Sequence, residues 1–250
     1  MKNVCAGQSL SAIKKFTYQL VSLESISNEV TRIFLKPSEQ SHFSWQAGQY
    51  IKILHENGDI SPLSIANAPT KSTLIELHLT QTADNSQSLD ILRTLTHEKK
   101  LILRGPYGSC TPEKFQHAKR IIFLARGSGF APIKAMIEAM AMTQNHPPIE
   151  LYWSATSPDE FYMLALLNRW EADIKNFSWT PILSRPHTNW QGKTGLLQHI
   201  LLENNSDIGN SAIYISAPYT VVYDVADALT AKGLSRETIF SDVFDYSVDD

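Results

Sequence analysis

A glycine-containing loop is the first segment whose residue types suggest chemistry. Residues 126–132 read Arg-Gly-Ser-Gly-Phe-Ala-Pro, directly after the apolar run 121–125, and they lead into a stretch with helical spacing. Glycine permits positive φ and lets a ligand approach the backbone, and a helix N-terminus presents free N–H groups to a phosphate. The loop predicts a nucleotide-phosphate site, although a plain strand-to-helix turn would leave the same pattern.

A second segment, residues 61–69, reads Ser-Pro-Leu-Ser-Ile-Ala-Asn-Ala-Pro. Pro62 and Pro69 fix φ and restrict the residues before them, so this segment is expected to be rigid and extended. It could hold a hydroxyl and backbone amides against a flat ligand. The alternative is an irregular edge strand between two turns.

The elements that must position these segments fall into two groups. In the first half, short apolar runs are separated by turn-forming residues. These runs lie at residues 16–23, 30–35, 49–54, 74–79 and 101–103. The partial alternation in 74–79 predicts a half-buried strand, Asn57-Gly58 predicts a hairpin, and one helix is expected over 88–95. Short strands at close spacing predict a small antiparallel β-barrel.

After Pro112 the sequence alternates between strand-like and helix-like runs. The strands are expected at residues 121–125, 149–153, 179–183, 212–215 and 238–240. The helices are expected at 132–142, 158–174, 196–202 and 221–232, the last ending at Gly233. This alternation predicts an α/β domain with a doubly wound parallel sheet.

Composition narrows the class of protein. The 250 residues are 43% hydrophobic and 19% charged, which excludes a disordered chain. The net charge of −3 disfavours nucleic-acid binding, and no apolar run could span a membrane. The two cysteines, Cys5 and Cys110, are too few for a disulfide framework or an iron–sulfur cluster, and no metal site is expected. A cytoplasmic protein is predicted.

Taken together and in this order, the segments resemble the ferredoxin–NADP reductase superfamily, over about residues 15–246. Within this superfamily the sequence most resembles bacterial NAD(P)H:flavin oxidoreductases and the reductase modules of iron–sulfur flavoenzymes. Residues 61–69 match the family's flavin motif, Arg-x-Tyr/Phe-Ser followed by small residues and Pro. Residues 105–108 match its Gly-Pro-x-Gly turn, and 126–132 match its pyridine-nucleotide loop.

The resemblance implies a flexible tail at residues 1–14, a flavin-binding antiparallel barrel at 15–112 and an NAD(P)-binding α/β domain at 113–250. It implies an enzyme that passes hydride from NAD(P)H to a flavin. Electrons would then go to free flavin or to a separate iron–sulfur or oxygenase protein. The alternatives are a degenerate, non-catalytic binding or regulatory member and a flavoprotein not reduced by NAD(P)H. The oligomeric state is not indicated.

The resemblance also implies roles for individual residues. The flavin is expected to contact Pro62, Leu63, Ser64, Ile65, His78, Ser88 and Phe244. The nicotinamide nucleotide is expected to contact Arg126, Gly127, Ser128, Gly129, Pro132, Ser154, Ala217 and Pro218. Ser64, near flavin N5, and Ser216, near the nicotinamide, are the predicted catalytic residues. His78 would reach the ribityl or phosphate region, and Phe244 would stack on the ring or pack in the core.

Three motifs depart from the family pattern. Ser61 stands where the family has the arginine that pairs with the flavin phosphate, so another cation, Lys52 or Arg104, would be needed. The resemblance implies FAD, but without this arginine the flavin phosphate would be held less tightly, so FMN or a loosely bound flavin is left open. In the nucleotide loop Arg126 replaces Gly, and later Ser216-Ala217 replaces Cys-Gly.

Cofactor choice is indicated by residues 154–160, which follow the second strand of the α/β half. They contain two acids and no cation, and a cation there would pair with the 2′-phosphate of NADPH. NADH is therefore favoured over NADPH. Arg185 and Lys193, further along, could reverse this preference.

Overall fold

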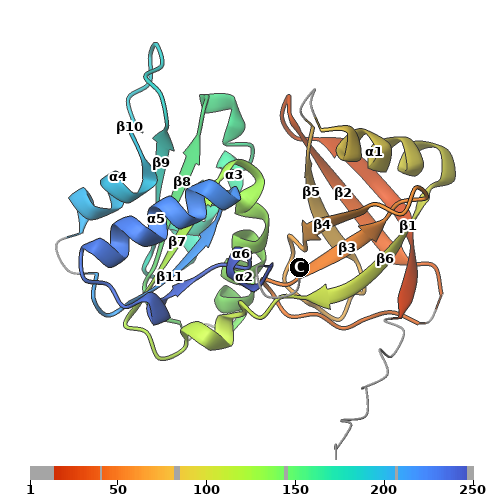
Figure 1. Ribbon diagram of the computed structural model, residues 1–250, viewed down its shortest axis with the longest axis horizontal. Helices are drawn as coiled ribbons and strands as arrows, with labels where there is room; N and C mark the ends of the chain where they lie inside the picture. The colour runs from red at the N-terminus through yellow and green to blue at the C-terminus, as the bar shows by residue number, and fades with distance from the viewer. Residues whose placement is uncertain (1–13, 40, 82–84, 144–145, 206–207, 247–250) are drawn as a thin grey trace, which may run out of the picture.

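Six strands from the first half of the chain form one antiparallel sheet in the computed structural model (Figure 1). They are β1 (Lys15–Ser25), β2 (Val30–Pro37), β3 (Tyr50–Leu54), β4 (Ile60–Ser64), β5 (Ile75–Thr80) and β6 (Lys100–Tyr107). Their order is β4-β3-β6-β1-β2-β5. An antiparallel bridge between Ile65 and Leu77 joins the two outer strands. The sheet therefore curls into the predicted barrel, and α1 (Ser86–Glu98) lies at one end.

Six further strands form a parallel sheet. They are β7 (Arg120–Arg126), β8 (Ile149–Ala155), β9 (Phe177–Leu183), β10 (Lys193–Thr194), β11 (Ser211–Ser216) and β12 (Ile239–Phe240), in the order β10-β9-β8-β7-β11-β12. The helices are α2 (Phe130–Thr143), α3 (Leu164–Asp173), α4 (Leu197–Asn204), α5 (Tyr219–Ala231) and α6 (Val243–Tyr246). Four 3₁₀ turns are η1 (Pro112–Phe115), η2 (Gly127–Gly129), η3 (Pro158–Glu160) and η4 (Arg236–Thr238).

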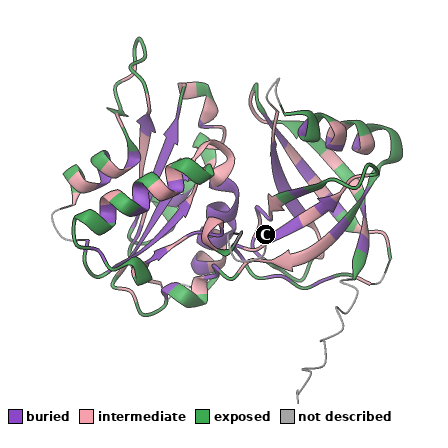
Figure 2. Ribbon diagram, viewed as in Figure 1, coloured by how far each residue is buried: buried purple, intermediate pink, exposed green. Residues whose placement is uncertain are grey.

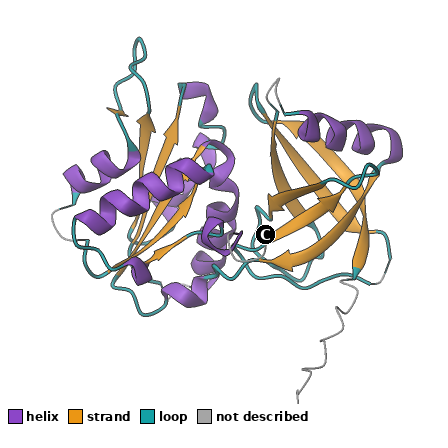
Figure 3. Ribbon diagram, in the orientation of Figure 1, coloured by secondary structure: helices purple, strands orange, loops and turns teal. Residues whose placement is uncertain are grey.

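Alternate residues of β7 explain why its sequence is continuously apolar. Phe123 and Ala125 pack with α2 and α3 on one face, whereas Ile122 and Leu124 pack with α4 and α5 on the other. Figures 2 and 3 show the buried strands between the two helical layers. A strand covered on both faces has no polar side. The predicted doubly wound sheet is confirmed.

Two predicted elements are wrong in detail. Residues 74–79 were expected to form a half-buried strand, but Glu76 and His78 of β5 are each only 2% exposed, because that face packs against the α/β half. The single helix expected over 158–174 is instead η3 followed by α3. The Glu160 side chain accepts from the Ser157 N–H and so caps the start of η3, and the turn ends at Phe161, whose φ of −81° and ψ of 68° are not helical.

Other local predictions hold. Residues 57–58 turn between β3 and β4, with Gly58 at φ +90°, and Gly233 ends α5 at φ +92°. Residues 60–64, however, form a regular strand, with Pro62 on the solvent-exposed sheet edge where a missing N–H is tolerated.

The structure describes residues 14–39, 41–81, 85–143, 146–205 and 208–246. The predicted tail at 1–14, with Cys5, lies almost wholly outside these ranges. Within them, none of the helices is long and apolar enough to cross a membrane. The domain boundary after residue 112 stays a prediction.

Candidate active site between the two sheets

Most of the predicted site residues meet in one cavity between the two sheets. This cavity has a volume of ≈ 270 Å³. The barrel contributes Pro62, Leu63, Ser64 and His78, and the α/β half contributes Arg126, Ser128, Gly129, Ala131, Pro132, Ser216, Ala217 and Pro218. The two predicted catalytic residues, Ser64 and Ser216, therefore face the same space from opposite sides.

A larger cavity, of ≈ 320 Å³, lies apart from this one and contains none of the predicted site residues. It is bordered by apolar residues such as Ala47, Pro112 and Met140 and by polar ones such as Gln46 and Glu113. Its size alone gives it no chemistry, whereas the ≈ 270 Å³ cavity collects hydroxyls, a cation and a glycine loop. The smaller space, which we call the central cavity, is therefore the candidate active site.

A third cavity, of ≈ 200 Å³, adjoins the central cavity at the N-terminal end of α1. The two share Pro62, Leu63, His78 and Ser128. The remaining polar lining consists of Ser61, Thr80, Asn85, Gln87 and Ser88. We call it the helix-end cavity. It contains no lysine or arginine among the described residues.

The N-terminus of α1 is capped by Asn85, whose Oδ1 accepts a hydrogen bond from the Ser88 N–H at 3.1 Å. Ser61, which stands where the family has arginine, is buried. Its hydroxyl lies 2.8 Å from His55 Nε2 and donates to Gln87 Oε1 at 3.1 Å. Ser61, hydrogen-bonded to His55 and Gln87, thus occupies the place of the missing arginine.

Small residues let the nucleotide loop approach the end of β11. Gly127 has φ +53°, a left-handed conformation that suits glycine, and its carbonyl accepts from Trp153 Nε1 at 3.0 Å. A Cβ atom on Gly129 would lie 2.0 Å from the carbonyl oxygen of Ser216. The loop and the 216–218 segment therefore touch only because residue 129 is glycine.

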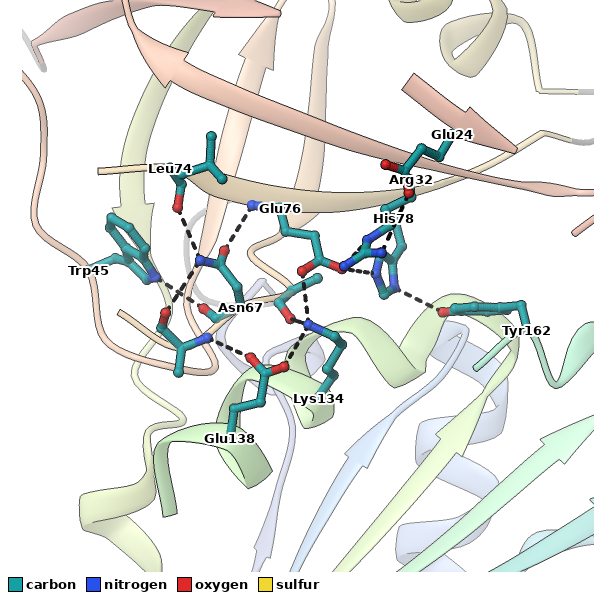
Figure 4. A network of polar contacts seen from close by, with 12 residues as sticks. Glu24, Arg32, Trp45, Asn67, Leu74, Glu76, His78, Lys134, Glu138 and Tyr162 are labelled. Carbon is teal, nitrogen blue, oxygen red and sulfur yellow. Dashed lines mark hydrogen bonds and ion pairs between the residues drawn. The ribbon is translucent and has the colours of Figure 1, made fainter. Parts of the chain in front are cut away.

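His78 lies at the centre of a polar network that joins the two halves (Figure 4). Its Nε2 lies 2.9 Å from Glu76 Oε1, and its Nδ1 lies 3.1 Å from the Tyr162 hydroxyl. Burial alone would raise the pKa of Glu76, but the His78 hydrogen bond and the Lys134 charge hold it at about 2. Because an ionised carboxylate only accepts, His78 donates through Nε2 and accepts from Tyr162 at Nδ1.

The imidazole is therefore neutral and has no free nitrogen. Burial, with the charges of Lys134 and Arg32, lowers the pKa of His78 against the opposing effect of Glu76. Desolvation, with the Glu76 charge, raises the pKa of Tyr162, so its O–H remains a donor. His78 lines both cavities, and both its ring nitrogens bind protein groups.

Several predicted residues lie away from the central cavity. Ile65 is fully buried in the barrel core. Ser154 borders a separate ≈ 70 Å³ cavity together with Arg126. Phe244 packs under the Arg236 guanidinium, 3.6 Å from the ring centroid, and against Tyr223. Ser88 borders only the helix-end cavity. Gly127 lines neither cavity, and its carbonyl binds Trp153.

The two cations considered as substitutes for the missing arginine also lie elsewhere. Lys52 and Arg104 are cross-strand neighbours on β3 and β6, and neither lines the two cavities. The Lys52 ammonium lies 4.8 Å from the Tyr107 ring centroid.

Sequence reasoning missed Glu76, Lys134, Glu138 and Tyr162, which belong to the network in Figure 4 together with Arg32 and Asn67. The available signal was Lys134, a lone lysine within the apolar stretch 130–142. In the described part of the chain, no group of three or more His, Cys, Asp or Glu side chains could hold a metal ion.

Comparison with known proteins places this cleft in a family. Residues 123–226 match the model of the oxidoreductase NAD-binding domain. Over 237 residues the chain is 30% identical to CDP-6-deoxy-L-threo-D-glycero-4-hexulose-3-dehydrase reductase of Yersinia pestis, covering 94% of this chain and 71% of the relative. The chain is also 27% identical to a probable flavin reductase of Photobacterium leiognathi, and the match covers 93% of this chain and 99% of the relative.

Among solved structures, a ferredoxin NADP+ reductase from Neisseria gonorrhoeae with bound FAD and NADP has a TM-score of 0.75. It is 20% identical and covers 91% of this chain and 98% of its own, which shows the shared fold. The chain belongs to the ferredoxin–NADP reductase superfamily. It is an NAD(P)H-dependent flavin oxidoreductase, and the non-catalytic alternative is disfavoured.

Proposed function

We propose that this protein reduces an exchangeable flavin with NADH, so that the flavin behaves as a substrate that leaves after reduction. The observation that carries this proposal is the helix-end cavity, which has hydroxyls, amides and a helix N-terminus but no described cationic side chain. A phosphate held by neutral donors alone is bound less strongly than one paired with a fixed guanidinium.

The residues present fit a flavin. Pro62 and Leu63 offer an apolar strand edge for a flat ring, and both line the two adjoining cavities. The ring system would lie in the central cavity, and the ribityl chain would run into the helix-end cavity. A bound flavin supplies the ability to accept hydride from NADH and to pass electrons on.

Ser64 and Ser216 carry the proposed chemistry of the protein itself. Ser64, at the end of β4, would donate a hydrogen bond to the flavin N5 region. Ser216, at the end of β11, would contact the nicotinamide. Hydroxyl donors fixed by strand ends stabilise developing charge with little reorganisation. Ser128, Gly129 and Pro132 would hold the nucleotide at the N-terminal end of α2, with Arg126 beside the pyrophosphate.

NADH is the proposed nucleotide. The Glu160 carboxylate accepts from the backbone N–H groups of Thr156 and Ser157, each at 3.1 Å, just after β8. Asp159 beside it is exposed. These two acids would repel the 2′-phosphate of NADPH. Arg185, which follows β9, is the cation that would favour NADPH instead.

Electron transfer to a separate protein is the second candidate. The Yersinia pestis relative is named as the reductase of a dehydrase, which favours a separate acceptor protein for this chain as well. We also propose a cytoplasmic location and keep the division into 15–112 and 113–250. Purified protein should lose its flavin on desalting and should oxidise NADH only when flavin is returned. Tight retention of flavin through desalting would favour the second candidate.

A further inference from the structure

Helix α2 sends two charged side chains into the barrel half. Lys134 is only 3% exposed, and its Nζ lies 3.0 Å from the Ala66 carbonyl oxygen, 2.9 Å from Glu76 Oε2 and 2.8 Å from Glu138 Oε1. An ammonium group has three N–H donors, and each has an acceptor here. The position of Lys134 is therefore fixed in three directions (Figure 4).

Glu138 completes the attachment one turn further along α2. Its Oε1 pairs with Lys134, and its Oε2 accepts the Ala68 N–H at 3.1 Å. The main chain of residues 61–69 is thus held at Ala66 and Ala68 by a single helix. Asn67, between them, binds β5 through the Glu76 N–H at 2.8 Å. We call Lys134 and Glu138 the α2 clamp.

The opposite end of the same helix lines the central cavity. Ala131 and Pro132 border it, directly after the glycine loop. Pro132 and Glu138 are six residues apart, which is about 9 Å along a helix. A short helix is stiff over this distance, so movement of the nucleotide loop and movement of residues 61–69 are coupled through α2.

Stability alone does not account for this clamp. Burying charged groups is costly, and apolar contacts would join two domains at least as well. Bonds to particular backbone atoms, however, fix position more narrowly than apolar contact does. The reaction needs such precision, because a displacement of about 1 Å can slow an enzyme roughly 100-fold.

We propose that Lys134 and Glu138 are positioning residues that set the spacing between the nicotinamide and the flavin. This inference rests on the placement of the two ligands proposed above. The clamp touches neither ligand site directly, since neither residue lines the central or the helix-end cavity. Its loss should therefore slow hydride transfer while leaving ligand binding nearly intact.

The test is rapid anaerobic mixing of NADH with protein saturated with flavin, for wild type, Glu138→Gln and Glu138→Ala. Truncating Lys134 would take one of its partners from the buried Glu76 carboxylate, so the half-buried Glu138 is the residue to change. Glu138→Ala should slow hydride transfer about 10- to 100-fold, with dissociation constants for NADH and flavin within about 3-fold. Glu138→Gln keeps one acceptor oxygen and should be intermediate.

Glu150→Ala is the matched control, because it breaks an ion pair with Arg120, at 3.0 Å, near the opposite end of the parallel sheet. Its hydride-transfer rate should equal that of wild type. The proposal is overturned if folded Glu138→Ala transfers hydride at the wild-type rate, or if its loss lies only in ligand binding. If Ser64→Ala is also without effect, the placement of the ligands is what has failed.

Discussion

Ser64 and Ser216 belong to different sheets, yet they line the same ≈ 270 Å³ cavity. Replacing either hydroxyl by hydrogen removes one fixed donor without opening a large gap. Ser64→Ala is expected to slow flavin reduction by NADH roughly 10- to 100-fold, and Ser216→Ala by a similar factor. Ser178→Ala, at an exposed position of β9, is the control. Steady-state rates at saturating NADH and flavin check this, and unchanged rates in both variants would count against the assigned roles.

Ser61→Arg should convert the helix-end cavity into a phosphate site. The affinity for FMN and FAD should rise about tenfold or more, which corresponds to roughly 1.4 kcal/mol or more, whereas riboflavin should gain nothing. The gain should shrink with salt. Fluorescence titrations of the three flavins measure it, and Ser61→Met is the uncharged control. An equal change for all three flavins would mean that the phosphate lies elsewhere.

Asp159→Arg should move nucleotide preference toward NADPH, because it places a cation where the structure has an exposed acid after β8. The ratio of kcat/KM for NADPH to that for NADH is expected to rise about tenfold, with little loss for NADH. Asp173→Arg, on an exposed site of α3, controls for net charge. A wild-type preference for NADPH would contradict the proposed use of NADH.

Asp242 should destabilise the protein at neutral and alkaline pH. Burial, with the charge of Asp245, raises the pKa of Asp242 to about 6 against the opposing hydrogen bond from Tyr214. The cost of ionising it is fully present above this pKa and disappears as the pH falls toward 4. Asp242→Asn should therefore raise the free energy of unfolding at pH 8 by about 1–3 kcal/mol and by less at pH 5. Denaturant unfolding measures both, and an equal gain at the two pH values would refute the assignment.

His78 should lower the stability of the folded protein as the pH falls, whereas acidification relieves the destabilisation caused by Asp242. Its pKa is lowered in the folded protein, so the unfolded chain takes up a proton first and stability is lost as the pH falls below about 6.5. One such group contributes a slope of at most about 1.4 kcal/mol per pH unit. On an Asp242→Asn background, which removes the opposing titration, His78→Gln should flatten the fall in stability between pH 6.5 and 5. Retention of the full slope would show that another group is responsible.

The order of the elements could be predicted because each was encoded locally. The apolar run 121–125 and the glycine loop after it gave the parallel sheet and its nucleotide end, and Asn57-Gly58 gave the hairpin. Contacts between the two halves could not be predicted in this way. Glu76 and His78 follow a half-buried strand pattern, and contacts from the α/β half bury them, Lys134 of α2 on Glu76 and Tyr162 on His78. Lys134 interrupts the apolar pattern of α2, and its partner Glu76 lies 58 residues away in the sequence.

The cleft between the two sheets is proposed to bring NADH to a bound flavin. The most direct measurement is the absorbance of oxidised flavin after anaerobic mixing of the flavin-loaded protein with NADH. We predict rapid bleaching whose rate saturates with NADH and falls in Ser64→Ala, with slower bleaching by NADPH. A flavin that binds but stays oxidised, or that bleaches at the same rate in Ser64→Ala, would contradict the account.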